Sequence, residues 1–453
     1  MAVVTFVEPS CAFNMYGYYR FPLMGSLCLG TILKEAGHEV TILRDSVRSL
    51  CDKGKGWLHE AILKADVVAI SLMTSTANRG YQIADAIRKV APRIRIIMGG
   101  SHPTYMSEEA LEHSDLVVRG EGEEVILEAV NNSDLTGIIQ GSQVEDLNKY
   151  PVPDFSIIAD QDRPPRQTPI STSRGCPYDC VFCSVSSTFG RKCRFRDPGN
   201  VLEEIVMRVA QGHKKFFFYD DNFAINRERT KILLDGIASR GLKIDWSAEA
   251  RTDVAKDGEL LELMARSNCK YMLIGLESVN PKTLVSYNKK QGIEDIKRCI
   301  TQLHRHGIRV HGMFVLGSDE DDSNTVRDTV EFCHEMKLDT VQFSILHPLP
   351  GSRLYDILDS ENRIFTKNWS LYDGSHVVFK PKKMLPMELQ EKFFWAWKKF
   401  YSLRLSPWGR GLLHFAICRY IFNRWHKVNK GVLAELRNRF SHIAERSRYT
   451  RNR

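Results

Sequence analysis

Three cysteines carry the clearest chemical signal in this chain. Cys176, Cys180 and Cys183 have the spacing CxxxCxxC within one short segment. Three thiolates on one loop can bind three irons of a 4Fe-4S cluster and leave the fourth iron free to bind another molecule. A structural zinc site is the alternative, but it needs four protein ligands, and no second ligand pair lies nearby. The spacing therefore predicts an iron-sulfur cluster with one reactive iron.

This motif resembles that of the radical S-adenosylmethionine (radical SAM) enzymes, in which an aromatic residue, here Phe182, usually precedes the last cysteine. The resemblance implies that the free iron binds the amino and carboxylate groups of SAM. Reductive cleavage would then give methionine and a 5′-deoxyadenosyl radical, which abstracts a hydrogen atom from the substrate. An electron donor such as flavodoxin or ferredoxin is an expected partner, because the cleavage consumes an electron.

The elements that position these cysteines form a regular series. From about residue 166 to 355, six apolar segments each end in polar or glycine residues, and helical patterns lie between them. Six such units predict a partial (β/α)6 barrel with its active face at the carboxyl ends of the strands. The last strand leads into Pro348-Leu-Pro-Gly-Ser352, which resembles a loop of the cobalamin-dependent and methylthiolating branches of the family.

Several residues at these strand ends match positions that hold SAM in the family. Asp220, Asp221 and Asn222 take the place of the GGE motif, so the resemblance implies that Asp220 or its neighbours accept hydrogen bonds from the methionyl ammonium group. Arg251 could pair with the methionyl carboxylate or form an ion pair between strands. In relatives, a glutamate at the position of Glu277 binds ribose hydroxyls. The expected SAM contacts are Phe182, Asp220, Asp221, Asn222, Arg251, Glu277, Ser278 and Val315.

The first 135 residues predict a small doubly wound parallel sheet. Its expected strands are 3–7, 39–43, 67–72, 94–98 and 116–118, with helical patterns between them. In such sheets a ligand lies at the carboxyl ends of the strands. Polar and glycine residues follow three of these strands, and they are Ser71, Thr74, Gly99, Gly100, Ser101, His102, Gly120, Glu121 and Gly122.

This segment resembles the cobalamin-binding domain that precedes many radical SAM barrels. The matching stretches are GGSHPT from Gly99, GEGE from Gly120 and FPLMGSL from Phe21. The resemblance implies that the nine residues above contact cobalamin. The motif D-x-H-x-x-G, whose histidine binds cobalt in other cobalamin proteins, is absent. We therefore expect cobalamin without that ligand, or a domain that has lost the cofactor, and we expect His102 to form loop hydrogen bonds.

These patterns give an α/β fold in four parts. Residues 1–135 form the cobalamin-binding-like Rossmann domain, 136–165 a proline-punctuated linker, 166–385 the radical SAM barrel, and 386–453 a basic, mostly helical region. The 453 residues, 43% of them hydrophobic, suffice for several cores. The start has no cationic segment before an apolar one, and most of the eleven cysteines are dispersed, so we expect a cytoplasmic protein.

Positive charge is concentrated at the end of the chain. From residue 391 onward there are 15 Lys and Arg against three Glu, a balance of +12, whereas the whole chain carries +8. The interleaved aromatics are Phe393, Phe394, Trp395, Trp397, Phe400, Trp408, Phe415, Tyr420, Phe422 and Trp425. Such a region could lie on an anionic membrane, or it could be a terminal subdomain that packs its aromatics on the barrel. Nucleic acid is a less favoured partner.

The order of domains predicts a cobalamin-binding radical SAM enzyme that methylates an unactivated carbon. Relatives use this architecture also for ring formation on tetrapyrroles and for rearrangement or coupling of lipids. The basic aromatic region favours a lipid or another membrane-associated small molecule as the substrate. The alternatives are a radical enzyme whose first domain binds no corrinoid, and a non-enzymatic zinc-binding scaffold. The methylthiotransferases are not favoured, because a second cysteine triad is absent.

Overall fold

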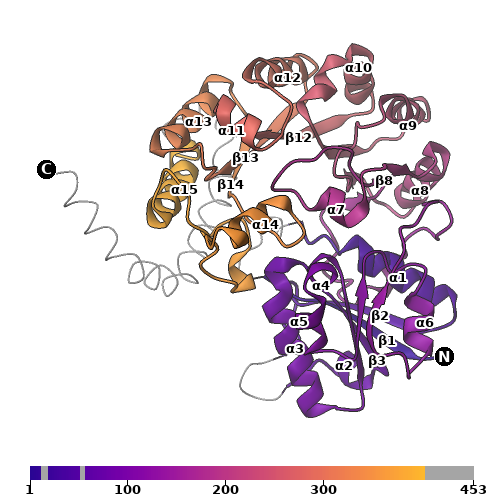
Figure 1. The fold of residues 1–453 in the computed structure, drawn as a ribbon. Helices are drawn as coiled ribbons and strands as arrows, with labels where there is room; N and C mark the ends of the chain where they lie inside the picture. The colour runs from indigo at the N-terminus through magenta and orange to yellow at the C-terminus, as the bar shows by residue number, and fades with distance from the viewer. Residues whose placement is uncertain (12–18, 52–56, 403–453) are drawn as a thin grey trace, which may run out of the picture.

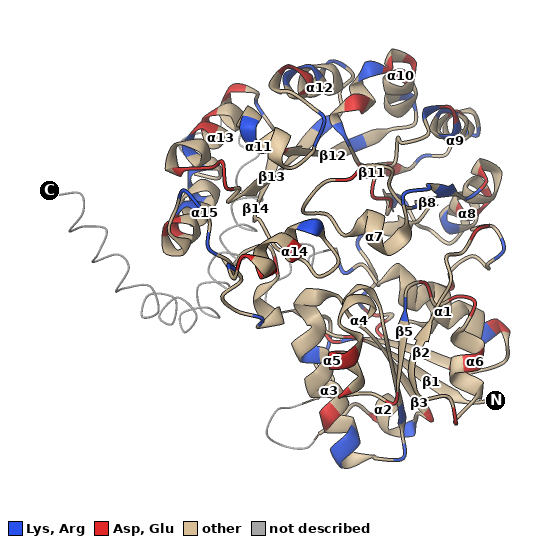
Figure 2. Cartoon of the chain, in the orientation of Figure 1, with Lys and Arg blue, Asp and Glu red and all other residues tan. Residues whose placement is uncertain are grey.

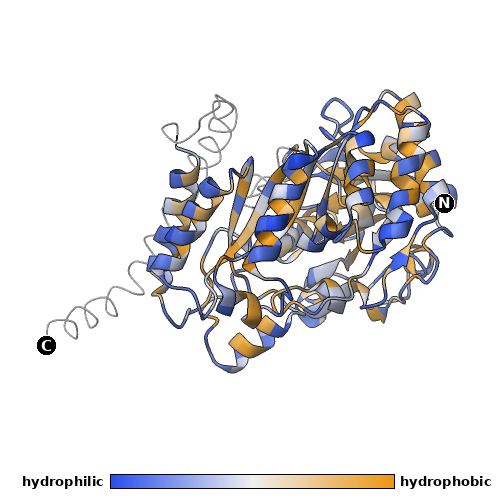
Figure 3. Cartoon of the chain, turned by 90° about the horizontal axis from the view of Figure 1, so that it is seen from above, coloured by the Kyte–Doolittle hydropathy of each residue, from blue (hydrophilic) through white to orange (hydrophobic). Residues whose placement is uncertain are grey.

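The computed structural model describes residues 1–11, 19–51 and 57–402, which form two six-stranded parallel sheets with helices packed against them (Figure 1). The α/β prediction is thereby confirmed. The strands are mostly hydrophobic, whereas the helices around them carry both hydrophilic and hydrophobic residues (Figure 3). Parallel strands covered by helices are buried on both faces, which explains their continuous apolar runs.

The first sheet has the strand order β2-β1-β3-β4-β5-β6 and carries helices on both faces (Figure 1). The order reverses between β1 and β3, and a ligand crevice in such sheets lies outside the strand ends at that point. Its strands are β1 (Val3–Glu8), β2 (Glu39–Arg44), β3 (Val67–Ser71), β4 (Arg95–Gly99), β5 (Leu116–Arg119) and β6 (Gly137–Gln140). Its helices are α1 (Met24–Glu35), α2 (Glu60–Lys64), α3 (Ala77–Val90), α4 (Ser101–Tyr105), α5 (Ser107–Leu111) and α6 (Ile126–Asn131).

The prediction of five strands for this sheet was one too few. β6 pairs in parallel with β5, with Leu116 opposite Gly137, although the sequence analysis assigned that segment to the linker. β6 is an edge strand of four residues with only partial burial, so it has no continuous apolar run to reveal it.

The second sheet has the order β14-β13-β12-β11-β10-β7, so its neighbours follow the chain and its helices lie along the outer side of an open arc (Figure 1). This is the expected partial barrel. Its strands are β7 (Thr168–Ile170), β10 (Lys215–Phe218), β11 (Asp245–Ala250), β12 (Cys269–Glu277), β13 (Arg309–Leu316) and β14 (Thr340–Ile345). The helices are α8 (Pro198–Ala210), α9 (Arg227–Ser239), α10 (Gly258–Arg266), α11 (Pro281–Ser286), α12 (Ile293–Arg305), α13 (Ser323–Glu335) and α14 (Arg353–Ser360).

One hydrophobic core joins the first sheet to the segment that follows β14. Residues of the first sheet such as Val7 and Met98 belong to the same buried cluster as Leu346, Trp369 and Phe379, which follow β14. Continuous close packing resists relative movement of the parts that it joins. The segment after β14 therefore holds the barrel against the first domain.

The last described helix, α15 (Pro386–Phe400), packs against the barrel. Phe393 is 3% exposed, and the indole of Trp397 donates a hydrogen bond to the carbonyl of Phe343 at 3.1 Å. Basic residues of α15 lie among acidic ones of the neighbouring helices (Figure 2). The aromatics of this helix thus serve packing, as one of the two alternatives for the basic region predicts. The other aromatics, from Trp408 to Trp425, lie outside the described residues.

Among the residues described, no helix has the length and hydrophobicity needed to cross a bilayer.

Candidate active site

The three cysteines lie on the loop between the short strand β8 (Ser173–Arg174) and helix α7 (Val185–Phe189). Gly175 starts the loop with a φ of +89°, and a Cβ there would come within 2.7 Å of the Lys192 carbonyl oxygen. Glycine is therefore required where the chain turns toward Cys176. The Cys183 amide donates a hydrogen bond to the Cys180 carbonyl at 3.1 Å, which brings these two ligands onto one turn.

All three thiols are free and partly exposed, as ligands of an external group must be. Among the described residues, no three His, Cys, Asp or Glu side chains are arranged around a single metal ion. A cubane cluster does not need such convergence, because each thiolate binds a different iron. The donor set fits a 4Fe-4S cluster, which would be held by Cys176, Cys180 and Cys183. Cys193 lies close by, with its sulfur 3.5 Å from the Gly175 carbonyl oxygen.

Arg251 lies against the cysteine loop. Its Nη1 is 3.8 Å from the Cys180 sulfur, and its guanidinium stacks over the Tyr178 ring at 3.7 Å from the centroid. It also donates a hydrogen bond to the Lys289 carbonyl. A fixed cation beside three thiolates stabilises negative charge on the cluster. Tyr178 was not identified from the sequence, because the stacking partner is 73 residues away and only the fold brings the two together.

Asp220 and Asp221 differ in what surrounds them, although they are adjacent at the end of β10. The Asp220 carboxylate accepts hydrogen bonds from the Thr172 amide at 2.7 Å, the Thr172 hydroxyl at 2.5 Å and the Ser173 amide at 3.0 Å. It therefore holds the strand that leads into the cysteine loop. Asp221 is accessible to solvent, yet the protein around it partly desolvates the carboxylate, and this desolvation together with the charge of Asp220 raises its pKa to about 6. Asn222 is buried.

Glu249 and Glu277 lie at the ends of the next two strands. Glu277 Oε1 is 2.5 Å from Lys289 Nζ, and the backbone of Glu277 has a φ of +65°, which is strained for this residue type. A Cβ on Gly275 would come within 2.6 Å of Glu277 Oε1, so glycine allows the side chain to fold back. Burial and the charges of Asp221 and Glu277 raise the pKa of Glu249 to about 7. Lys289 was missed in the sequence because no spacing marks this contact.

The other expected SAM contacts lie around the same strand ends. Ser278 is buried beside Glu277, and its hydroxyl accepts a hydrogen bond from the Asn280 amide at 3.1 Å. Val315 is a partly buried residue of β13. The Phe182 ring packs edge to face against Tyr287 at 5.0 Å between centroids. Whether these residues contact SAM stays a prediction.

The residues expected to contact cobalamin follow β3, β4 and β5 at one edge of the first sheet. Ser71 ends β3, Gly99 ends β4 and Gly120 follows β5, while Thr74 and Ser101 lie in the next turns. The φ of Gly100 is +104°, and a Cβ there would come within 2.6 Å of the Leu72 carbonyl oxygen. Gly100 is thus needed for the packing of its own chain, whether or not a ligand binds there.

His102 is fully buried. Its Nδ1 is 3.4 Å from the Thr74 hydroxyl, and its Nε2 is 3.5 Å from Glu109 Oε1. The Trp369 ring packs edge to face on it at 4.9 Å, and the Trp369 indole donates a hydrogen bond to Glu109 at 2.7 Å. Both nitrogens of His102 therefore face protein groups. This geometry agrees with a hydrogen-bonding role and argues against His102 as a direct cobalamin contact.

Glu121 and Gly122 face the barrel and helix α1, respectively. The Glu121 carboxylate is 2.5 Å from the Arg194 guanidinium and 3.0 Å from that of Arg174. Its oxygens are therefore already paired with side chains of the protein. A Cβ on Gly122 would come within 3.3 Å of the Leu29 side chain. Neither contact was predicted, since Arg194 is 73 residues from Glu121.

Helix α4, which ends just after the GGSHPT stretch, touches the PLPGS loop across the domains. The Tyr105 ring lies directly over Gly351 of the PLPGS loop, where a Cβ would come within 2.3 Å of the ring. The Tyr105 hydroxyl is 3.0 Å from the Thr188 hydroxyl, and Ser187 donates a hydrogen bond to the Gly351 carbonyl at 2.7 Å. Helix α7, which follows Cys183, is thereby fixed between the GGSHPT segment and the PLPGS loop.

Aromatic rings from both domains stack beside the Asp221 strand end. Phe21 stacks on Tyr19 at 5.6 Å and on Phe217 at 5.2 Å between centroids. Tyr219 meets Phe21 edge to face at 6.3 Å and is 38% exposed. An exposed aromatic at this strand end offers an apolar surface to a ligand that binds there.

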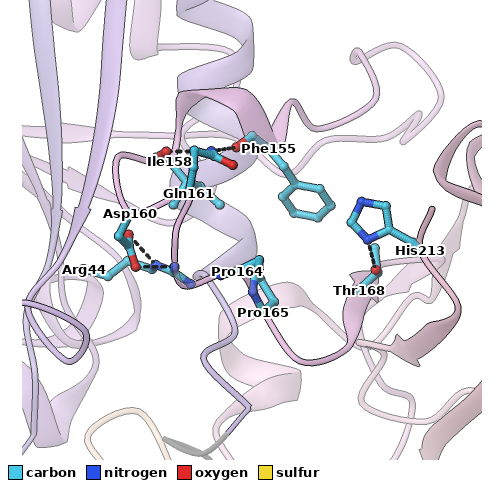
Figure 4. Close-up of a pocket in the computed structure, with 9 residues that line it drawn as sticks. All are labelled: Arg44, Phe155, Ile158, Asp160, Gln161, Pro164, Pro165, Thr168 and His213. Carbon is cyan, nitrogen blue, oxygen red and sulfur yellow. Dashed lines mark hydrogen bonds and ion pairs between the residues drawn. The ribbon is translucent and has the colours of Figure 1, made fainter. Parts of the chain in front are cut away.

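A small cavity of about 90 Å³ lies elsewhere, between the linker and the barrel (Figure 4). Its walls include Phe155, Pro164 and His213, and the Arg44–Asp160 ion pair, at 2.5 Å, closes one side (Figure 4). It does not include the cysteines or the predicted cofactor contacts. This cavity is too small for either large cofactor and belongs to the joint between the domains.

Comparison with known proteins agrees with both halves of this arrangement. The model of the radical SAM superfamily matches residues 170–350, and that of the B12 binding domain matches residues 17–130. The bacteriochlorophyllide d C-12(1)-methyltransferase of Chlorobaculum tepidum is 32% identical over 349 residues, which are 74% of this chain and 75% of that protein. The anaerobic magnesium-protoporphyrin IX monomethyl ester cyclase of Rubrivivax gelatinosus is 27% identical over 82% of this chain and 72% of its own.

Among solved structures, the cobalamin-dependent S-adenosylmethionine radical enzyme OxsB, with aqua-cobalamin and S-adenosylmethionine bound, has a TM-score of 0.67. The match covers 98% of this chain and 75% of that chain at 14% identity, so it shows a shared fold. The cysteine loop, the two sheets, the two family models and a relative with 32% identity over 74% of the chain lead to one conclusion: the chain belongs to the B12-binding radical SAM enzymes, whose cofactors are a 4Fe-4S cluster, SAM and cobalamin.

Proposed function

We propose that this enzyme transfers a methyl group to an unactivated carbon of an apolar small molecule. The main support is the methyltransferase of Chlorobaculum tepidum, which is 32% identical over 74% of this chain. When bound, the cofactors supply a carbon-centred radical at the cluster and a methyl group at the corrinoid. The contacts of Tyr105 and of Glu121 hold the two halves of the site together, as a reaction that uses both cofactors requires.

The protein's own groups would bind and orient SAM. We assign the ammonium group of SAM to Asp221 rather than Asp220, because Asp220 already accepts three hydrogen bonds from its own chain. Glu277 is positioned by Lys289 and would hold a hydroxyl of the ribose. Arg251 would stabilise the negative charge of the cluster and of the methionyl carboxylate.

The substrate would be a large apolar ring system or a lipid. Tyr219 and Phe21 present aromatic surface at the strand end beside Asp221. The two relatives named above act on a bacteriochlorophyllide and a magnesium-protoporphyrin ester, which are large, flat molecules. Peripheral membrane contact through the basic residues of the chain end would bring such a molecule to the enzyme. A one-electron donor such as flavodoxin or ferredoxin would reduce the cluster.

The test needs no knowledge of the substrate. The anaerobically reconstituted protein, supplied with hydroxocobalamin, SAM and a strong chemical reductant, should form both 5′-deoxyadenosine and S-adenosylhomocysteine. The first product reports radical formation, and the second reports loss of a methyl group from SAM. If 5′-deoxyadenosine forms without S-adenosylhomocysteine, methyl transfer is contradicted and ring formation, the activity of the cyclase relative, becomes the better assignment.

A pair of cysteine variants makes this test specific. Cys180→Ala removes one cluster ligand and should abolish formation of 5′-deoxyadenosine together with most of the bound iron. Cys193→Ala is the matched control, because this thiol lies beside the loop but outside the CxxxCxxC motif. It should retain the iron and the activity. Equal iron content and turnover in Cys180→Ala and the native protein would contradict the cluster assignment.

A further inference from the structure

A buried ion network joins the first domain to the cysteine loop. Glu121 and Glu123 follow β5, whereas Arg174 lies in β8 and Arg194 in β9 (Arg194–Phe195). Arg194 contacts both oxygens of Glu121, at 2.5 and 2.9 Å. Arg174 bridges Glu121 at 3.0 Å and Glu123 at 2.5 Å.

The burial of this network makes its geometry rigid. Glu121 is 5% exposed and Arg194 is 3% exposed, so loss of either partner would leave the other charge buried and unpaired. Backbone groups of Val144 join the same network. Arg194 donates a hydrogen bond to the Val144 carbonyl at 2.7 Å, and the Val144 amide donates one to Glu121 at 3.2 Å. A shift of one segment against the other would therefore leave several buried charges without partners.

The network lies where both cofactor sites begin. Arg174 is two residues before the cluster ligand Cys176, and β8 pairs with β9 through Arg174 and Arg194. Glu121 directly follows Gly120 at the strand end expected to face cobalamin. A shift of these carboxylates relative to the two arginines would thus move one cofactor relative to the other.

We propose that Glu121, Glu123, Arg174 and Arg194 are positioning residues that set the separation between the cluster and cobalamin. This inference rests on the proposed function, because it requires that cobalamin is bound. The four residues take no part in the chemistry. They act through the backbone of the cysteine loop and of the strand end after β5.

The distance can be followed by electron paramagnetic resonance of the holoenzyme. After partial reduction, cob(II)alamin and the reduced cluster are both paramagnetic. The cluster then enhances the relaxation rate of the cobalt signal, and this enhancement falls steeply as the distance between the two centres increases. In Glu121→Gln, which keeps the shape of the side chain but removes its charge, most of this relaxation enhancement should be lost. The iron and corrinoid contents should stay at the native level.

Glu145→Gln is the matched control. Glu145, next to Val144, pairs at 2.9 Å with Lys192, which lies two residues before Arg194, but the side chains of both Glu145 and Lys192 are more than 70% exposed. Water screens such a pair, and its loss should leave the relaxation enhancement unchanged. If Glu121→Gln does not fold, Arg174→Gln serves instead, because its side chain is 20% exposed, and Arg174→Lys should restore part of the enhancement.

The outcomes separate the two proposals. An unchanged enhancement in Glu121→Gln or its substitute, with both cofactors bound, would overturn the positioning role and leave the proposed function intact. Loss of a cofactor from both variants would also overturn it, because the network would then serve binding rather than spacing. A native protein that retains the cluster but no cobalamin would overturn the proposed function itself.

Discussion

At the scale of single residues, neighbouring acidic side chains of the site have different surroundings and different roles. Asp220 is turned into its own chain and holds the approach to the cysteine loop, whereas Asp221 beside it faces solvent. Glu277 is paired with Lys289. At Glu249, burial together with the surrounding carboxylates raises the pKa to about 7. The type of residue alone could not reveal these differences, because both members of each pair are carboxylates at strand ends.

The two aspartates should respond differently to the same substitution. Asp220→Asn replaces a charged acceptor of three hydrogen bonds and should lower the free energy of unfolding by about 1.5 to 3 kcal/mol, with loss of iron from the cluster. Asp221→Asn should leave stability and iron nearly unchanged but weaken SAM binding. Denaturant unfolding, iron analysis and SAM titration measure these effects. Equal loss of iron in the two variants would contradict the division of roles.

Glu8, at the end of β1, should make stability depend on pH. It is 6% exposed, and burial raises its pKa to about 8 although Arg44 and the Leu23 amide oppose the rise. The folded protein therefore holds a proton that the unfolded chain releases above about pH 4.5. Stability falls as the pH rises from about 4.5 to 8, and the full penalty is present above pH 8.

Glu8→Gln removes this titration while it keeps an acceptor for the Leu23 amide, which lies 2.9 Å from Glu8 Oε1. Relative to the native protein, the variant should gain about 2 to 4 kcal/mol in free energy of unfolding between pH 5 and pH 8.5. Urea unfolding at the two pH values measures the gain. A difference between variant and native protein that is the same at both values would show that Glu8 is already ionised at pH 5.

At the scale of elements, strand positions could be predicted but contacts between loops could not. Strands such as β3 and β13 are apolar runs that end at glycine or polar residues, so their place and their active edge follow from the sequence. β6 escaped notice because it is a short, half-exposed edge strand. The contact of α4 with the PLPGS loop joins residues 246 positions apart, and no local pattern encodes such a distance.

The contact between Tyr105 and Gly351 can be tested against a second glycine of similar backbone conformation. Gly351 has a φ of +85° and Gly374 one of +81°, so alanine costs about 1 to 2 kcal/mol at either position from the backbone alone. Only at Gly351 would the new methyl group strike a ring, because the nearest atom at Gly374 is 3.7 Å away. Gly351→Ala should therefore cost about 1 to 3 kcal/mol more than Gly374→Ala in denaturant unfolding.

A Tyr105→Ala background supplies the control for that comparison. Without the ring, the extra cost of Gly351→Ala over Gly374→Ala should disappear, because only the backbone cost is left. An extra cost that persists in this background would place the strain in the PLPGS loop itself rather than in its contact with α4.

At the scale of the whole molecule, two domains are held by packing and charge so that one site can use two cofactors. The continuous core through Trp369 and the network through Glu121 both join the first domain to later parts of the chain. The family and its cofactors could be predicted from motifs that lie within short segments. The joint between the domains could not, because it depends on how two separately folded sheets meet.

The end of the chain should determine whether the enzyme binds a membrane, but it should not affect cleavage of SAM. Trp397 and the Tyr401 hydroxyl, which donates a hydrogen bond to the Val341 carbonyl at 2.6 Å, anchor helix α15 on the barrel through residues that precede residue 403. Residues 403–453 carry 12 Lys and Arg against two Glu. Near an anionic surface each basic residue contributes about 1 kcal/mol of attraction, which salt weakens.

Deletion of residues 403–453 should therefore abolish binding to vesicles that contain anionic lipid and leave formation of 5′-deoxyadenosine from SAM at the native rate. Flotation of the native and shortened proteins with anionic and neutral vesicles, at low and high salt, measures the first effect. The native protein should bind only the anionic vesicles, and less at high salt. Phe393→Ala serves as the contrasting variant for stability. The Phe393 side chain is buried in the core of the barrel, so its loss should cost about 3 to 5 kcal/mol of stability. Undiminished vesicle binding by the shortened protein would assign membrane contact to the described part of the chain. It would contradict a membrane role for residues 403–453.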